Sequence, residues 1–163
     1  RESGIYAKGK RNSTFTEYYQ DGVTPRKETP MQQGKIDGTV KTYFRNGKIE
    51  AEKEYKQSVE SGRERRFDSK TGEQIFESHY IDGKKDGEEW EIFEDASTLR
   101  SRIIRHYRNG KLDGSYRVES TRDGKPYITI EGQYTDGEKS GQWIEHNYDN
   151  NTQTCTWHGE GGA

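Results

Sequence analysis

A five-residue pattern, Gly-x-x-x-Gly, recurs along the chain at intervals close to 25 residues, and this recurrence restricts the fold more than any other feature. We call each occurrence a box. Four boxes keep both glycines, and two more have lost one glycine each. The boxes begin at residues 9, 34, 58, 83, 110 and 137. A fixed period of this length is typical of a repeat protein, in which each repeat packs on its neighbours.

The residues that follow each box predict a β-hairpin. A short stretch with aromatic side chains, such as residues 40–44, leads into a turn signal such as Asn46-Gly47. A second strand then ends in an aromatic residue such as Tyr55. Asn-Gly between two such stretches favours a tight hairpin, because both turn positions need a positive φ. We expect the box itself to form the turn that joins one hairpin to the next, since its two glycines tolerate unusual backbone angles.

The composition favours strands over helices. Only 26% of the residues are hydrophobic and 34% are charged, while the net charge is -2. The apolar residues are too few for a thick core, but they are mainly aromatic or β-branched and therefore suit a half-buried pleated surface. The sequence predicts an all-β fold: an elongated, single-layer antiparallel meander, twisted or curved, with six hairpin repeats over residues 9–148. Residues 1–8 are predicted as the last strand of a preceding repeat, and residues 149–163 as a C-terminal strand or tail.

The box Gly34-Lys-Ile-Asp-Gly38, followed by an aromatic strand, a turn and a strand ending in Tyr, resembles the MORN-type repeat. More specifically, it resembles the bacterial variant found in YwqK-like antitoxins. The resemblance extends from about Gly9 to Tyr148. It implies a curved β-meander that binds a partner along its face, and it implies no catalytic residues. Ser13 and Ser58, which stand where a box glycine is expected, indicate a diverged array.

The chain has no pattern typical of an enzyme or a metal centre. His79 and His106 hold equivalent places in adjacent repeats, so we expect them to lie roughly 10 Å apart, too far to share one metal. Cys155 and His158 supply only two ligands. The glycine boxes lead into strands, so no helix start is available to bind phosphate. We therefore expect no catalytic residues, no metal, no cofactor and no small-molecule substrate.

Charged residues alternate in sign along the chain, with a basic cluster at 63–66, an acidic one at 88–95 and a basic one at 100–108. They fit cross-strand ion pairs, and they also fit a mixed docking surface. Candidate partner contacts are rings and long charged side chains on the predicted strands: Tyr43, Arg65, Trp90, Arg100, Arg102, Tyr116 and Trp143. The alternative for the rings is stacking between neighbouring hairpins. An unpaired edge strand is a second place where a partner can bind.

The fourth repeat departs most from the pattern, because a longer loop at Asp95–Thr98 replaces its tight turn. We expect this repeat to be the one specialised for a partner. The pI of about 6.2 and the lack of a sustained basic face argue against nucleic acid.

The expected function is therefore that of a non-enzymatic protein-binding module. The resemblance implies an immunity or antitoxin-type protein that binds and neutralises a cognate bacterial toxin. The alternative is a MORN scaffold or a membrane-peripheral structural protein, although no basic or apolar stripe that would face anionic lipid stands out. The chain begins at Arg1 rather than Met, which fits either a cleaved signal peptide or an expression boundary. We expect a periplasmic or exported protein rather than a cytoplasmic one.

Overall fold

The computed structural model of the chain describes residues 2–94, 100–122, 124–147 and 151–159. Strands make up 74% of the structure and helices 0%. The chain divides into two compact units, residues 1–84 and 85–163. The expected loop at Asp95–Thr98 and the residue Tyr148 lie outside the described ranges.

The strands follow one another with short connections. The first unit contains β1 (Glu2–Ser3), β2 (Tyr6–Ala7), β3 (Lys10–Arg11), β4 (Thr14–Tyr18), β5 (Pro25–Gln32), β6 (Lys35–Ile36), β7 (Gly38–Tyr43), β8 (Ile49–Lys56), β9 (Val59–Phe67) and β10 (Gln74–Ile81). The second unit contains β12 (Gly87–Glu94), β13 (Arg100–Arg108), β14 (Lys111–Arg122), β15 (Lys125–Thr135), β16 (Glu138–Asn147) and β17 (Thr152–His158). The short strand β11 (Lys84–Lys85) spans the boundary between the units.

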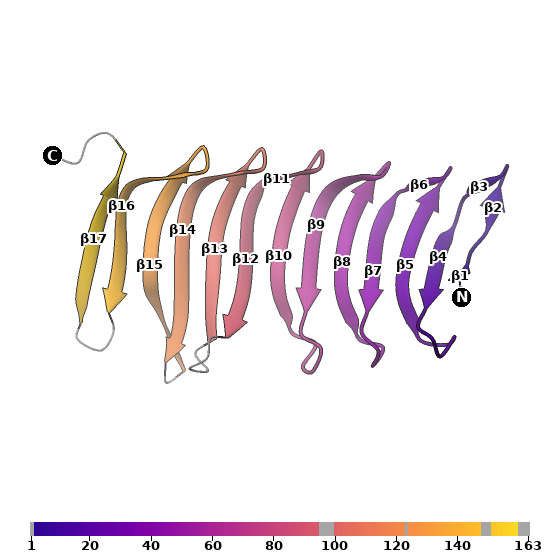
Figure 1. Cartoon of the computed structure of the whole chain (residues 1–163), viewed down its shortest axis with the longest axis horizontal. Helices are drawn as coiled ribbons and strands as arrows, with labels where there is room; N and C mark the ends of the chain where they lie inside the picture. The colour runs from indigo at the N-terminus through magenta and orange to yellow at the C-terminus, as the bar shows by residue number, and fades with distance from the viewer. Residues whose placement is uncertain (1, 95–99, 123, 148–150, 160–163) are drawn as a thin grey trace. The chain divides into compact units, whose positions relative to one another are not determined.

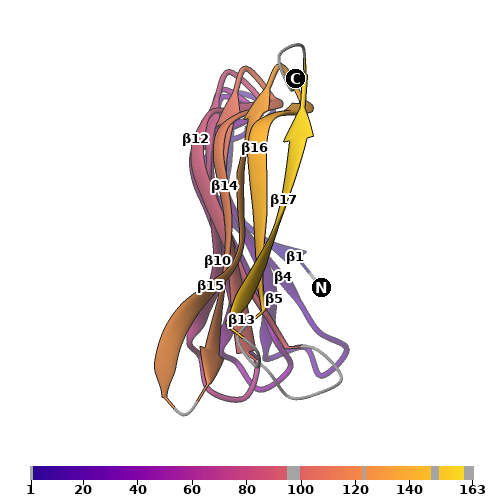
Figure 2. The same cartoon turned by 90° about the vertical axis from the view of Figure 1, so that its left-hand side faces the viewer.

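Each unit contains an open antiparallel sheet in which strands that are consecutive in the chain lie side by side (Figure 1). The order is β1-β4-β5-β7-β8-β9-β10 in the first unit and β12-β13-β14-β15-β16-β17 in the second. The strand β6 also pairs with β5, and β2 and β3 form a short hairpin of their own. Figure 2 shows the strands of the second unit from the side, as one layer. The predicted all-β antiparallel meander is confirmed.

The tight turn at each box is shorter than the sequence indicated. Gln33 and Gly34, at the turn after β5, have φ values of 52° and 85°. Such a pair of positive φ angles is typical of the two-residue type I′ hairpin turn. The next box residues already lie in a strand, β6 in this repeat. The prediction that the whole box forms the turn is therefore wrong, since only its first residue does so, together with the residue before the box.

The second glycine of the box lies in a β-bulge. Between Tyr107↔Leu112 and Arg105↔Tyr116, the register of β13 and β14 shifts so that β14 carries two extra residues. Gly114 lies within this insertion and has a φ of 119°, which a side chain would disfavour. The same shift of two occurs between β8 and β9 and between β15 and β16. The box is thus a turn residue followed by a bulge, and this explains why both glycines recur.

Hydrogen bonds tie each turn to the box before it. The first box residue donates its backbone N–H to the carbonyl of the third residue of the preceding box, at 2.7–2.8 Å. These bonds join Gly34 to Arg11, Ser58 to Ile36, Gly83 to Glu60, Gly110 to Lys85, and Gly137 to Leu112. In some repeats the fourth box residue also accepts a bond from the next turn, as Asp86 does from the N–H of Asn109 at 3.0 Å. The number of residues in a repeat is therefore the number needed to place one turn beside the turn of the next repeat.

One face of each sheet carries the buried rings and is here called the core face. Its main row contains the residue six places after the start of each box, which we call the core position. In the register of the sheet, the residue at the core position lies beside one residue of each neighbouring strand. That neighbour has either a small side chain or a long charged one. The row of the first unit is Phe15, Thr29, Val40, Lys53, Glu64 and Ser78. The row of the second unit is Glu89, Arg105, Tyr116, Gly132, Trp143 and Thr156.

Two rings at the core position lie over glycines: Trp143 over Gly132 of the adjacent strand β15, and Phe15 over Gly4, which follows β1. A Cβ atom at Gly132 would overlap the ring of Trp143, and one at Gly4 would lie 2.5 Å from the ring of Phe15. Trp143 is only 4% exposed, and its ring centroid lies 5.3 Å from Tyr116 and 5.2 Å from Tyr134. A sheet without a second layer can therefore bury rings by laying them along its own surface.

We predict that Gly132→Ala destabilises the protein by about 1–3 kcal/mol, because the new methyl group overlaps the Trp143 ring in a packed site. Urea unfolding followed by circular dichroism measures the loss. In a Trp143→Val background the same substitution should cost less than about 0.5 kcal/mol, because the ring is gone and Gly132 has no positive φ. Equal losses in both backgrounds would contradict the proposed packing of the ring on the glycine.

Candidate functional site

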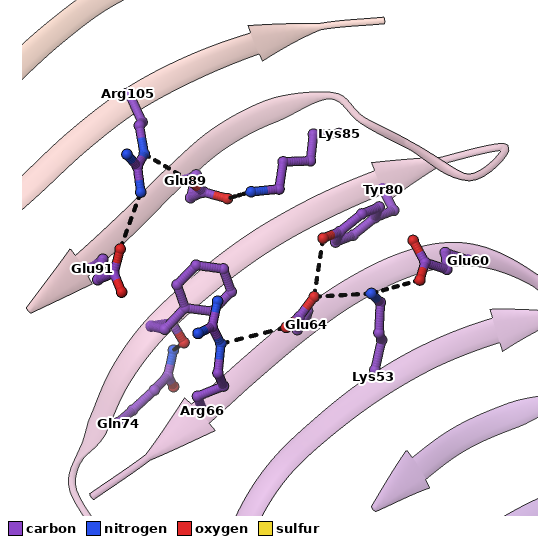
Figure 3. A network of polar contacts seen from close by, with 11 residues as sticks. Lys53, Glu60, Glu64, Arg66, Gln74, Tyr80, Lys85, Glu89, Glu91 and Arg105 are labelled. Carbon is purple, nitrogen blue, oxygen red and sulfur yellow. Dashed lines mark hydrogen bonds and ion pairs between the residues drawn. The ribbon is translucent and has the colours of Figure 1, made fainter. Parts of the chain in front are cut away.

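Two glutamates occupy the core position in the third and fourth repeats, where the other repeats carry Phe, Val, Tyr or Trp. Glu64 is half-buried, and Glu89 has 0% of its surface exposed. A carboxylate in such a place is strongly unfavourable unless cations and hydrogen-bond donors surround it. Figure 3 shows that each glutamate has such partners within its own unit.

Glu64 in the first unit is held by side chains from three strands. The Lys53 ammonium lies 3.1 Å from its carboxylate, and the Tyr80 hydroxyl donates a hydrogen bond to it at 3.0 Å. Arg66 lies 3.4 Å away and stacks its guanidinium on the ring of Phe76 at 3.6 Å. This cluster replaces the apolar contact that a ring would make with ion pairs and a hydrogen bond.

Glu89 in the second unit is paired more tightly. Its carboxylate accepts a hydrogen bond from Arg105 Nε at 2.7 Å and contacts the ammonium of Lys85. A second nitrogen of Arg105 reaches Glu91 at 3.1 Å. The Lys85 ammonium also lies 5.0 Å from the ring centroid of Tyr107. Because the charges of Glu89 are matched in place, this network stabilises the sheet and resembles the arrangement around Glu64.

The tyrosines beside these carboxylates have pKa values above the usual value of a phenol. Burial, and then the charge of Glu64, raises the pKa of Tyr80 to about 12. Burial and the charge of Glu89 raise the pKa of Tyr107 in the same way. On the other face of the first unit, burial and a hydrogen bond to Glu28 raise the pKa of Tyr43 to about 12. All three phenols are therefore neutral donors or packing groups near pH 7.

The opposite face of each sheet is here called the outer face, and its main row contains the seventh residue after the start of each box. In the first unit this row is Thr16, Glu28, Lys41, Glu52, Arg65 and Glu77. Its charges alternate and pair: Glu52 lies 3.5 Å from Lys41 and 2.8 Å from Arg65. Two predicted contact residues are engaged here, since Arg65 pairs with Glu52 and the Tyr43 hydroxyl donates to Glu28 at 2.7 Å.

The outer row of the second unit has a different character. It consists of Trp90, Ile104, Arg117, Glu131, Ile144 and Cys155. Its two charged members, although opposite in register, pair with other residues: Arg117 with Glu119 at 3.0 Å, and Glu131 with His146 at 3.2 Å. The outer face of the second unit therefore carries apolar side chains with charged residues between them. The outer face of the first unit instead carries a continuous row of charges that alternate in sign.

Trp90 and Arg102, both predicted contacts, come together on this outer face. The Arg102 guanidinium lies 4.5 Å from the Trp90 ring centroid, a cation–π arrangement. The Nε atom of Arg102 is buried and has no hydrogen-bond partner among the residues that the structure describes. Trp90 is also the only ring at the seventh position of any repeat, where the others carry Thr, Lys, Arg, Arg and Ile. The fourth repeat thus has its acid on the core face and its ring on the outer face.

Two open depressions flank the Trp90–Arg102 pair. The first has a volume of about 350 Å³, and its lining includes Ile104 and Ile144 with polar side chains of Glu88, His106, Arg117 and Glu131. The second has a volume of about 180 Å³, and its lining includes Ile92, Arg100, Arg102, Glu119 and Pro126. We name this surface, with Trp90, Arg102 and the two depressions, the outer-face site.

Two of the remaining predicted contacts, Tyr116 and Trp143, lie on the core face. Tyr116 and Trp143 stack on each other within the row of the second unit, which is the alternative foreseen for the rings. Arg100 belongs to the outer-face site. Sequence reasoning did not select Glu64 and Glu89, or the floor residues of the depressions. A comparison of the core position across the six repeats would have revealed both glutamates, because most other repeats carry a ring at that position.

The histidines have partners of their own. His106 shares a 3.0 Å hydrogen bond with the Ser115 hydroxyl and lies 3.7 Å from Glu88, while His79 lies 3.8 Å from Glu77. In the described ranges no three His, Cys, Asp or Glu side chains are grouped closely enough to hold a metal ion. Nor does the described part of the chain contain a long apolar helix suited to crossing a membrane.

Comparison of the sequence with protein-family models and with characterised proteins finds no match.

We predict that the free energy of unfolding falls between pH 10 and 12 and that Tyr80→Phe reduces this fall. The fold raises the pKa of Tyr80 to about 12, so its contribution is complete below pH 10 and is lost as the pH rises through 12. Urea unfolding at fixed pH values measures the effect. Glu64→Gln keeps the phenol but removes the charge, so it lowers the folded-state pKa of Tyr80 and should make the fall smaller and end it at a lower pH. A Tyr80→Phe profile parallel to that of the wild type would refute this role.

Proposed function

We propose that this chain is a non-enzymatic protein-binding module and that it contacts its partner through the outer-face site of the second unit. The observation that carries the proposal is Trp90. It is a ring on the outer face at a position where the other repeats carry polar or aliphatic residues, and it is stacked with Arg102. Trp and Arg are the residue types that most often anchor protein interfaces.

The shape of the surface supports a protein partner. Both depressions are open and lie on one face of a sheet, whereas small-molecule sites usually enclose most of the ligand. Their lining combines isoleucines with carboxylates and guanidinium groups. A partner side chain can fill a depression while its charged neighbours join the Arg117–Glu119 and Glu131–His146 pairs, which gives orientation as well as affinity.

The resemblance to YwqK-like antitoxins gives the class of partner. We propose that the chain is an immunity or antitoxin-type protein and that the partner is a cognate bacterial toxin. The mixed charge of the outer-face site supports this over the alternative of a membrane-peripheral scaffold. An anionic lipid surface would meet Glu88, Glu119 and Glu131 as well as the arginines, and the repulsion would offset part of the attraction.

We predict that Trp90→Ala and Arg102→Ala each weaken binding to the cognate toxin, tested as the product of the neighbouring gene, by roughly 30-fold or more, as expected when an interface anchor is removed. Isothermal titration calorimetry with the purified toxin measures the affinity. Growth of cells that co-express the toxin measures protection, which should fall in the same variants.

Lys41→Ala is the matched control, because Lys41 holds the same repeat position on the outer face of the first unit. It should bind and protect like the wild type, and thermal melting should show that all variants are folded. Full protection by folded Trp90→Ala would rule out the outer-face site. A chain that binds no neighbouring gene product but sediments with anionic vesicles would favour the scaffold alternative.

A further inference from the structure

Among the described residues β17 (Thr152–His158) is the last strand in the sheet order of the second unit, and its composition is unusual for such a strand. Its only strand neighbour in the described residues is β16. Its sequence, Thr-Gln-Thr-Cys-Thr-Trp-His, contains no Asp, Glu, Lys, Arg or Pro. Every other described strand of more than two residues carries at least one charged residue. Natural sheets normally protect a free edge with such charges or with proline, because exposed backbone groups otherwise pair with another strand.

The first strand at the other end of the sheet order is protected in that manner. The strand β1 (Glu2–Ser3) has only two residues, and its Glu2 is paired with Arg11 at 2.7 Å. A copy of β17 would find few backbone groups to pair with on β1. Association of β17 with β1 of another copy would also continue without limit into a filament, whereas association of β17 with itself closes as a two-fold dimer. The preferred partner of β17 is therefore another β17.

The sequence of β17 suits antiparallel pairing with itself. Cys155 is the middle residue of the seven, so a two-fold axis beside it would place Cys155 opposite its own copy. In that register Thr154 faces Thr156 of the second copy, and Gln153 faces Trp157. The facing pairs are all uncharged and include β-branched and aromatic residues, which favour strand pairing. Trp157, 63% exposed in the single chain, would gain a cross-strand contact.

We propose that two copies of this chain form a dimer through β17, paired antiparallel about a two-fold axis at Cys155. The seven-residue edge supplies backbone donors and acceptors from both copies, and the pairing joins the outer rows of the two second units at Cys155. The dimer therefore carries two outer-face sites.

Charge substitutions test both the dimer and its register. In the proposed register residue 154 of one copy faces residue 156 of the other, so Thr154→Lys/Thr156→Lys sets like charges opposite each other. Thr154→Lys/Thr156→Glu sets opposite charges in the same places, with the same residues changed. Sedimentation equilibrium should give the wild type and the Lys/Glu variant a mass near twice 18.9 kDa. The Lys/Lys variant should dissociate at least about tenfold more readily.

Cys155 provides an independent readout, because it is exposed and its copy would lie directly opposite, with the Cα atoms roughly 4.5–5.5 Å apart. A short bismaleimide, which adds to two thiols without oxidation, should crosslink the wild-type dimer. Cys155→Ser should abolish the crosslink and leave the mass unchanged. A monomeric wild type at high concentration would overturn the proposal. So would equal masses for the Lys/Lys and Lys/Glu variants, because the dimer would then use another surface or register.

Discussion

The hydrogen bond from each turn to the box before it is the interaction on which the rest of the structure depends. It joins the N–H of the first box residue to the carbonyl of the third residue of the preceding box, as between Gly110 and Lys85. Register in a sheet is strict, because a shift of one residue moves every side chain to the other face. By fixing one turn against the next, this bond places the residue six places after the start of each box on the core face and the following residue on the outer face.

The core face then has to bury its side chains without a second layer. Where the core position is a large ring, the adjacent strand offers a glycine, as Gly132 does to Trp143. Where the core position is Glu64, the adjacent strand offers Lys53. Both arrangements fill the same site of the repeat, one with dispersion contacts and the other with matched charge. Glu89 is the extreme case of the second arrangement, because it is fully buried and accepts a hydrogen bond from Arg105.

The ion-pair networks also distinguish the outer face of the first unit from that of the second. Charges that pair along a row, such as Lys41, Glu52 and Arg65, hold neighbouring strands in register and leave little for a partner. The outer face of the second unit breaks that row with Trp90, Ile104 and Ile144. The fourth repeat is where the two faces exchange residue types, since its acid lies on the core face and its ring on the outer face. Apolar side chains and charges therefore occur together on the outer face of the second unit, where Trp90, Ile104 and Ile144 interrupt the row of charges.

The sequence by itself determined the repeat period, the all-β class and the antiparallel order, because recurring glycines and turn signals act locally along the chain. It also predicted the fourth repeat as the exception, on the basis of a loop at Asp95–Thr98 that lies outside the described residues. Tertiary structure decided what local signals do not contain. The first box residue lies in the turn, the next two pair in a strand and the last two lie in the bulge, because that division depends on pairing with the previous strand. Likewise, Tyr116 and Trp143 pack within the core face while Trp90 lies on the outer face, because the face of a side chain depends on register. The burial of Glu89 was decided in the same way, since its partners Lys85 and Arg105 reach it only once two strands are aligned.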